Sequence, residues 1–273
     1  MRGFRSSLDS IPVVVKNLII INILFFLADQ FLGKALDINF VKLFGLYFFE
    51  SPYFAPWQLV THMFMHGGFS HLFFNMFALF MFGRILEQAW GAKKFLFFYF
   101  SCGLGAALIH TLAIWVDYSS MQSAYVEFQN TPTPELLSHF VADNIPHAQQ
   151  WVYEFLDNWA DNPDSQAFVA QGTQLFQRVM IDSLNVPTVG ASGAVFGLLL
   201  GFGMLFPNTE LMLLFPPIPI KAKYFVVLYG AAELYFAMLN SAGDNVAHVA
   251  HLGGMIFGFI IIKVWQKSRK NFY

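Results

Sequence analysis

Residues 94–116 read KFLFFYFSCGLGAALIHTLAIWV, and no charged residue follows Lys94 in this run. Because about 20 consecutive apolar residues cross the hydrocarbon core of a bilayer as a helix, the run predicts a transmembrane helix. The whole chain has the same character, since 56% of its 273 residues are hydrophobic and only 12% are charged, against about 25% charged residues in soluble domains. The sequence therefore predicts a membrane protein rather than a water-soluble domain.

Apolar segments on both sides of this run predict an all-α, polytopic fold with six transmembrane helices. The predicted spans cover residues 14–32, 70–89, 95–116, 189–206, 223–240 and 246–265. The first follows Arg2 and Arg5 as a signal peptide would, but its apolar part is long and no small-residue cleavage site follows, so we expect a retained anchor. The expected parts are three spans with an outer loop in residues 1–116, a polar insert in 117–187, and three spans in 188–273.

The basic residues are unevenly distributed over the predicted loops. Of the 15 Lys and Arg residues, only Lys34, Lys42 and Arg178 fall outside when the N-terminus is placed in the cytoplasm. Cytoplasmic loops are enriched in such residues, so both termini are predicted to be cytoplasmic, in a cell (inner) membrane. The net charge is -2 and there is no basic arm, which argues against a nucleic-acid partner.

The polar insert is predicted to lie on the extracytoplasmic side. Within it, residues 134–161 place Trp151, Phe155, Leu156 and Trp159 at helical spacing, which predicts a small amphipathic subdomain near the membrane surface. Two interpretations stay open, a variable insertion without catalytic chemistry and a segment that grips substrates.

Polar residues inside predicted spans gather at one depth. The second, fourth and sixth spans all run from outside to inside, and near their starts stand His71 and Asn75, Ser192, and His248 and His251. Polar side chains are costly in a bilayer, so such residues tend to face a bundle interior or a cavity. Three helices are thus expected to bring polar groups to one level near the outer surface.

Small residues predict that two of these helices pack closely. The fourth span carries Gly193, Gly197 and Gly201, and the sixth carries Gly254 and Gly258. Glycines at four-residue spacing let helix backbones approach each other. The hydroxyl of Ser192 and the imidazole of His251, which shares a helix face with the sixth-span glycines, are therefore expected within hydrogen-bond reach.

A serine hydroxyl becomes a good nucleophile when a neighbouring base takes its proton, and histidine is the usual base near neutral pH. Asp244, the aspartate nearest the sixth span, lies in the short outer loop before it, so a triad is possible but a Ser-His dyad is predicted. His71 and Asn75 share one helix face and are suited to donate hydrogen bonds to an oxyanion; the alternative is that they only hold helices together.

Three segments at these positions resemble the motifs of one family. GASGAVFG at residues 190–197 resembles the GxSG signature of rhomboid intramembrane serine proteases, HLGGMIFG at 251–258 their histidine helix, and SHLFFN at 70–75 their His and Asn segment. The resemblance covers the six-span core and excludes the insert. One GxSG is weakly specific, whereas three motifs in this order and at consistent depths are highly specific for a rhomboid-like bundle.

The resemblance implies a role for each of these residues. Ser192 is the expected nucleophile and His251 the expected base. The oxyanion hole is expected to combine the side chains of His71 and Asn75 with the backbone N–H groups of Ser192 and Ala191.

The family pattern also distinguishes His251 from His248. It has glycines three and seven residues after the catalytic histidine, which fits Gly254 and Gly258 for His251 and fails for His248. Phe196 stands where the family often has an aromatic residue that stacks on this histidine.

Three further residues are interpreted through the resemblance to rhomboids. Glu233 lies in the fifth span, the movable side gate of the family, and either holds the bundle together or takes part in gating. Glu87, at the inner end of the second span, is expected to be structural. Gln58 stands where many members have Arg, which puts the anchoring of the outer loop in doubt, a loop of residues 39–57 expected to be half-immersed in the outer leaflet.

His62, His66 and His71 have the spacing of metal ligands, but no HExxH motif is present, so neither a metal nor a cofactor is expected. The resemblance implies cleavage of transmembrane or membrane-proximal segments of single-span membrane proteins in the lipid bilayer. Two rivals are a rhomboid-like pseudoprotease, which the intact set of site residues disfavours, and a solute transporter, for which no inverted repeat is visible.

Overall fold

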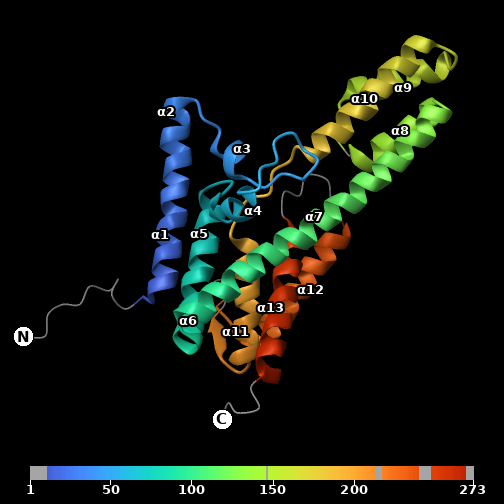
Figure 1. The fold of residues 1–273 in the computed structure, drawn as a ribbon. Helices are drawn as coiled ribbons and strands as arrows, with labels where there is room; N and C mark the ends of the chain where they lie inside the picture. The colour runs from blue at the N-terminus through green and yellow to red at the C-terminus, as the bar shows by residue number, and fades with distance from the viewer. Residues whose placement is uncertain (1–10, 146, 213–216, 240–246, 269–273) are drawn as a thin grey trace, which may run out of the picture.

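The computed structural model describes residues 11–145, 147–212, 217–239 and 247–268 (Figure 1). Arg2, Arg5, Asp244 and the predicted span limits at residues 240 and 246 lie outside these ranges. In chain order, with η for π- and 3₁₀-helical segments, the elements are α1 Val13–Leu27, η2 Ala28–Gly33, α2 Lys34–Leu36, α3 Phe40–Phe44, α4 Gln58–Thr61, η3 His62–Phe64, α5 Phe69–Ala78, η4 Leu79–Gly83, α6 Arg84–Trp90, α7 Ala92–Asn130, α8 Pro134–Asn144, α9 Gln150–Asp161, α10 Gln166–Leu184, α11 Ser192–Leu205, β1 Glu210–Met212, β2 Pro219–Lys221, α12 Ala222–Leu239 and α13 His248–Ser268.

Five helical stretches in the described part of the chain are long and apolar enough to cross a membrane. They are Val13–Leu36, Phe69–Trp90, Ala92–Asn130, Ala222–Leu239 and His248–Lys267. The predicted helical membrane fold is therefore confirmed, and these stretches overlap five of the six predicted spans. In the described residues, β1 and β2 pair as a small antiparallel sheet between α11 and α12.

The predicted fourth span, residues 189–206, contains a shorter helix than expected. α11 has 14 residues, which at about 1.5 Å per residue is shorter than the roughly 30 Å hydrocarbon core. It packs against α7, α12 and α13, and most of its residues from Gly193 to Gly203 are buried. Because other helices surround α11, its apolar sequence reflects burial within the protein, and six crossings stay a prediction.

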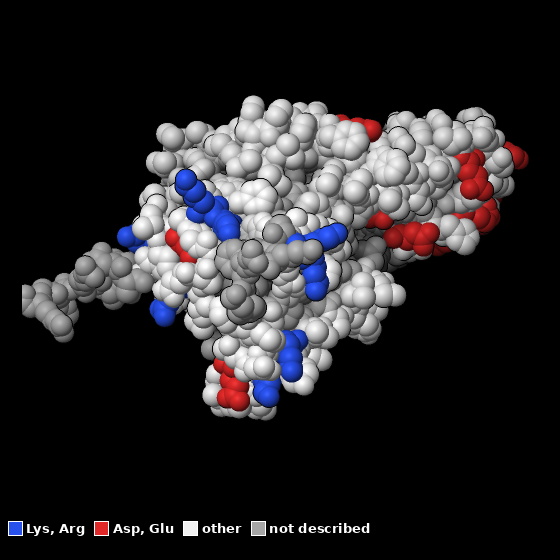
Figure 2. Space-filling model, turned by 60° about the horizontal axis from the view of Figure 1, so that its bottom comes forward, with Lys and Arg blue, Asp and Glu red and all other residues white. Residues whose placement is uncertain are grey.

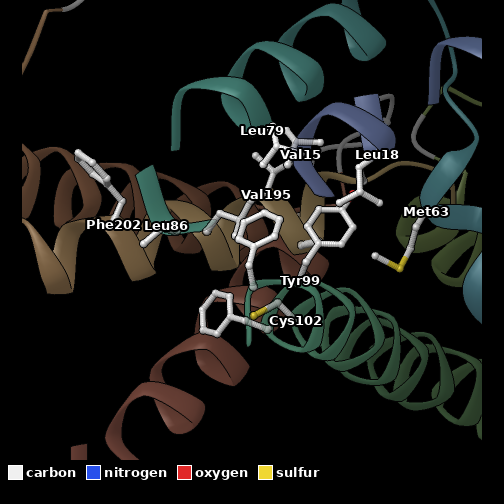
Figure 3. Close-up of a cluster of buried hydrophobic side chains, with 14 of the residues drawn as sticks. Val15, Leu18, Met63, Leu79, Leu86, Tyr99, Cys102, Val195 and Phe202 are labelled. Carbon is white, nitrogen blue, oxygen red and sulfur yellow. The ribbon is translucent and has the colours of Figure 1, made fainter. Parts of the chain in front are cut away.

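A continuous apolar core joins the first half of the bundle to α11 (Figure 3). Leu79 of η4, Tyr99 and Cys102 of α7, and Val195 and Phe202 of α11 are all buried in it. Cys102, the one cysteine, lies where α7 meets Gly197 of α11 and is a free thiol. The core fixes α11 between helices that come from both ends of the chain.

Glu87 of α6 closes the start of α1, far from the residues of the predicted site. Its two carboxylate oxygens accept hydrogen bonds from the backbone N–H groups of Val14 and Val15, at 3.0 and 2.8 Å. The first N–H groups of a helix have no partner within that helix, and a carboxylate also complements the positive end of the helix dipole. This buried carboxylate is thus structural, in line with the expectation from the sequence.

α7 continues well beyond the predicted third span and carries a second packed unit (Figure 1). Its last turns and α8, α9 and α10 enclose a separate apolar cluster that contains Phe128, Phe140, Trp159 and Phe176. The rings of Phe140 and Phe176 stack with their centroids 3.5 Å apart. Of the aromatic residues predicted on the amphipathic segment, Trp159 is fully buried, whereas Trp151 is 53% exposed and does not join the cluster.

Basic and acidic residues are unevenly distributed over the face drawn in Figure 2. Figure 2, which brings the bottom of Figure 1 forward, shows Lys and Arg around the lower face of the bundle and a concentration of Asp and Glu on the projecting unit formed by α8–α10. This distribution agrees with the orientation expected from the positive-inside rule, which stays a prediction.

Gln58 organises the outer loop although it stands where many rhomboids have Arg. Its side chain is 1% exposed. The amide oxygen accepts from the N–H groups of Tyr47 and Ala55, and the amide nitrogen donates to the carbonyl oxygens of Leu43 and Tyr53. One neutral amide thus holds several backbone groups of this loop.

Candidate active site

Ser192 is the first residue of α11, and the segment before it is held by the outer loop. Leu46 and Thr188 exchange two backbone hydrogen bonds of 2.9 and 2.8 Å. The N–H of Gly190 then donates to the carbonyl oxygen of His62, at 2.9 Å. The first N–H groups of α11, including that of Ser192, have no partner within the helix.

Gly190 brings the His71 ring and the Ser192 hydroxyl to the same place. Its φ of +121° lies in the region that glycine adopts without strain. A Cβ atom built at this position would lie 2.8 Å from Cε1 and Nε2 of His71 and 3.7 Å from Oγ of Ser192. The imidazole and the hydroxyl therefore border one glycine, as their shared depth predicts.

α11 and α13 cross at backbone contact through the glycines that the sequence singled out. A methyl group at Gly254 would overlap the carbonyl oxygen of Gly193, and one at Gly197 would lie 3.1 Å from the carbonyl oxygen of Gly254. Gly193 also faces the carbonyl oxygen of Ala250, the residue before His251. The crossing therefore places the start of α11 beside the histidine-bearing turn of α13.

The imidazole of His251 is held on one face by Phe196. The two rings are stacked, with centroids 4.1 Å apart and planes inclined by 9°. His251 is 8% exposed and Phe196 is 7% exposed. Because Phe196 lies one helical turn after Ser192, the helix that carries the hydroxyl also sets the plane of the imidazole.

A carboxylate from α12 completes the surroundings of His251. Oε2 of Glu233 lies 2.9 Å from Nδ1 of His251 and 2.6 Å from Nδ1 of His248. Glu233 is 5% exposed, so both contacts are shielded from solvent. The sequence offered Asp244, in the loop before the sixth span, as the nearest acid, whereas the carboxylate beside His251 is that of Glu233. Glu233 is an ionisable residue inside a span, which is the signal that also pointed to His71, His248 and His251.

Asn75 lies on the same helix as His71 and is buried. Its side-chain amide donates to the carbonyl oxygen of His71, at 2.9 Å, while Nδ1 of His71 accepts from the N–H of Gly67, at 3.3 Å. The acceptor role of Nδ1 leaves the ring proton on Nε2, the atom that faces Gly190. A neutral His71 is thus oriented to donate a hydrogen bond toward the Ser192 side.

A small cavity of about 20 Å³ lies beside Ser192. Its walls include His62, Thr188, Gly190 and Ala250. A volume of about 10–15 Å³ suffices for one water molecule when polar partners are present. Burial lowers the pKa of His62 to about 4, so this imidazole is neutral near pH 7 and lines the cavity without a charge.

His66, four residues after His62, packs edge-on against His71 with ring centroids 5.0 Å apart. Burial, with a smaller contribution from His71, lowers the pKa of His66 to about 4. One group of residues in the described part of the chain could hold a metal ion, and it does not consist of His62, His66 and His71. That group is Glu233, His248 and His251, whose ligand atoms lie within 4.8 Å of one another.

The known proteins to which this chain is similar are rhomboid proteins. The family model of the Rhomboid domain matches residues 54–121 and 166–267, which is more than half of the chain. An uncharacterized mitochondrial rhomboid protein of Schizosaccharomyces pombe is 28% identical over 217 residues, 77% of this chain and 52% of that protein. The rhomboid protease AarA of Providencia stuartii is 26% identical over 268 residues, 94% of this chain and 73% of AarA.

A shorter similarity links the chain to mitochondrial rhomboid protein 1 of Saccharomyces cerevisiae, which is 34% identical over 94 residues, 31% of this chain and 25% of that protein. This chain spans about half the length of the Schizosaccharomyces pombe relative. The gap in the family match, residues 122–165, falls on the end of α7 and on α8 and α9. With the domain match on both sides of this insertion, the chain belongs to the rhomboid family.

Proposed function

We propose that this chain is an intramembrane serine protease that cleaves other membrane proteins, with Ser192 as nucleophile and His251 as general base. The observation that carries the proposal is the glycine crossing of α11 and α13, which brings the start of α11 to the turn of α13 that bears a buried, ring-stacked histidine. The similarity to AarA, which is a rhomboid protease by name, supports the same activity.

In the proposed reaction, Nε2 of His251 takes the proton of the Ser192 hydroxyl while Oγ attacks the carbonyl carbon of the scissile peptide bond. The tetrahedral intermediate collapses when the C–N bond breaks and the imidazolium returns its proton to the leaving amine. A water molecule, deprotonated by the same imidazole, then hydrolyses the acyl-enzyme and regenerates the Ser192 hydroxyl.

The oxyanion of the intermediate would be stabilised by donors that exist before substrate binds. They are the backbone N–H groups of Ala191 and Ser192 at the start of α11, Nε2–H of His71 and the side-chain amide of Asn75. The buried neighbours of these groups exclude bulk water, which strengthens each hydrogen bond.

Water and substrate would approach from the outer end of the bundle. The cavity beside Ser192 is large enough for one water molecule, which the acyl-enzyme needs for hydrolysis. The family resemblance implies substrates with a single membrane span, cleaved in or near the outer end of their helix at a small residue. The proposed setting is a cell (inner) membrane, with both termini in the cytoplasm and the active site open to the other side.

The decisive experiment measures cleavage of a single-span reporter by the purified full-length chain in detergent. We expect cleavage by the wild type and a loss of more than about 1,000-fold in S192A and in H251A, because each removes one partner of the proton transfer. Matched controls are S123A, an exposed serine on the outer part of α7, and H139A, an exposed histidine of α8.

A fluorophosphonate probe gives a readout that does not depend on the choice of substrate. It should label the wild type and neither S192A nor H251A. Undiminished cleavage by S192A would overturn the mechanism. A wild-type chain that neither takes up the probe nor cleaves any of a broad reporter panel would instead favour the pseudoprotease.

A further inference from the structure

The Ser192 and His251 pair alone does not explain why the carboxylate of Glu233 is buried beside it. Glu233 is 5% exposed and lies on α12, a helix whose other buried residues are Ala222 and Val226. Its Oε2 atom meets two imidazole nitrogens, one from each of two successive turns of α13. Burying an ionisable group is costly unless it is well paired, so this arrangement calls for a specific explanation.

The contacts decide which nitrogen of His251 carries the proton. An ionised carboxylate only accepts hydrogen bonds, so Nδ1 of His251 must be the N–H donor at 2.9 Å. The other ring nitrogen, Nε2, then keeps its lone pair and can accept the proton of a serine hydroxyl. Phe196 fixes the plane of the ring, and Glu233 fixes its rotation and tautomer.

We propose that Glu233 is a positioning residue of the active site, which makes the catalytic group Ser192–His251–Glu233 rather than a dyad. This inference rests on the proposed function. The carboxylate holds His251 in the tautomer that can act as a base and stabilises the imidazolium that forms when the serine proton is transferred. His248 donates to the same oxygen and orients the carboxylate.

The proposed acid and the proposed base come from different helices. α12 carries the acid, α13 the base and α11 the nucleophile. Displacement of α12 would withdraw Oε2 from Nδ1 of His251 and leave the imidazole free to change tautomer. The base is therefore fully prepared only while α12 is packed against α13.

The test compares two buried carboxylates that are equally shielded. Glu233 and Glu87 are each 5% exposed, but Glu87 only caps α1. In E233Q the amide can donate to Nδ1 and so favour the wrong tautomer; we expect kcat to fall by about 1,000-fold with KM within about twofold, and E233D to recover part of the loss. E87Q should lower the thermal midpoint and leave kcat within about threefold.

A pH profile separates positioning from packing. The groups that face His251 are Glu233 and His248 by contact and His71 and His110 through electrostatic interaction. Removing the negative charge in E233Q disfavours the imidazolium, so the acidic limb of kcat/KM should move to lower pH by about one unit. The limb should stay in place in E87Q.

Two further experiments test the role of Glu233, one with the H248A variant and one with a metal chelator. H248A should retain at least about a tenth of the wild-type rate, since Oε2 still meets His251. If H248A abolishes probe labelling while E233Q labels as fast as the wild type, the assignment of Glu233 is wrong. It is also wrong if o-phenanthroline abolishes cleavage and Zn²⁺ restores it, because a metal would then occupy the carboxylate and both histidines.

The probe also separates this inference from the proposed function. A wild type that is labelled at Ser192, together with an equally labelled E233Q, overturns only the role of Glu233. A wild type that is neither labelled nor active overturns the proposed function itself.

Discussion

At the scale of single residues, the geometry of the site depends on a glycine at which one additional carbon atom would not fit. Gly190 has a φ of +121°, and a Cβ atom at this position would lie 2.8 Å from the His71 ring. Both the backbone conformation and the limited space therefore require a glycine. Neighbouring Ser192 and the proposed oxyanion donors take their positions from this turn. The GxSG signature thus has a physical reason at its first glycine.

We expect G190A to lose at least about 100-fold in cleavage rate. Its Cβ would force an unfavourable backbone conformation, at about 1–3 kcal/mol, and would push the His71 ring away from the Ser192 hydroxyl. The matched control is G68A, where an added Cβ meets no atom within 4 Å. The measurement is reporter cleavage together with the thermal midpoint, and a fully active G190A would contradict the close approach of His71.

At the scale of helices, the crossing of α11 and α13 carries the proposed catalytic pair. Helices in a bilayer associate through packing because lipid tails are as apolar as the side chains that they replace. The contact between the backbones at Gly193, Gly197 and Gly254 is therefore a main source of the stability of this pair. Glycine spacing in the two segments was a sufficient signal to predict the contact from the sequence.

G254A is expected to destabilise the bundle by about 2–3 kcal/mol, since its methyl group would overlap the carbonyl oxygen of Gly193 and backbone atoms cannot move aside without separating the helices. G230A on α12 is the control, because there the added Cβ approaches only the flexible end of Met255. Thermal unfolding in detergent measures both variants. Equal midpoints for G254A and the wild type would argue against the crossing.

At the scale of the whole molecule, one continuous helix connects two separate apolar clusters of the described residues. α7 joins the membrane bundle to the unit of α8, α9 and α10, whose apolar cluster shares no residue with the bundle core. Trp159 is the largest fully buried side chain of this unit, in edge-to-face contact with Phe128. A destabilising substitution in this unit should therefore leave the bundle folded.

W159A is expected to cost about 3–5 kcal/mol within this unit and to expose residues 131–184 to limited proteolysis. Probe labelling of Ser192 should remain within about twofold of the wild type. W151A, which removes a side chain that is 53% exposed, should change neither readout. Loss of Ser192 labelling in W159A alone would show that the insertion supports the active site directly.

The sequence by itself determined the membrane class and the rhomboid family motifs, and it predicted which residues share one depth. Composition, glycine spacing and polar residues inside apolar runs are local properties, and they identified Ser192, His251, His71 and Asn75 as one group. The same properties leave the fourth predicted span untested, because an apolar run reads alike whether lipid or protein covers it. α11 packs against α7, α12 and α13, and most of its residues from Gly193 to Gly203 are buried.

Only the tertiary structure decided which carboxylate lies beside His251. The partner of its Nδ1 atom comes from another helix, and the pairing depends on how α12 rotates about its axis and packs against α13, which residue spacing within one helix does not encode. The same reason explains Gln58, whose four backbone partners come together only when the outer loop folds around it. Sequence periodicity places a residue on a face of its own helix, whereas contacts between helices follow from the packing of the whole bundle.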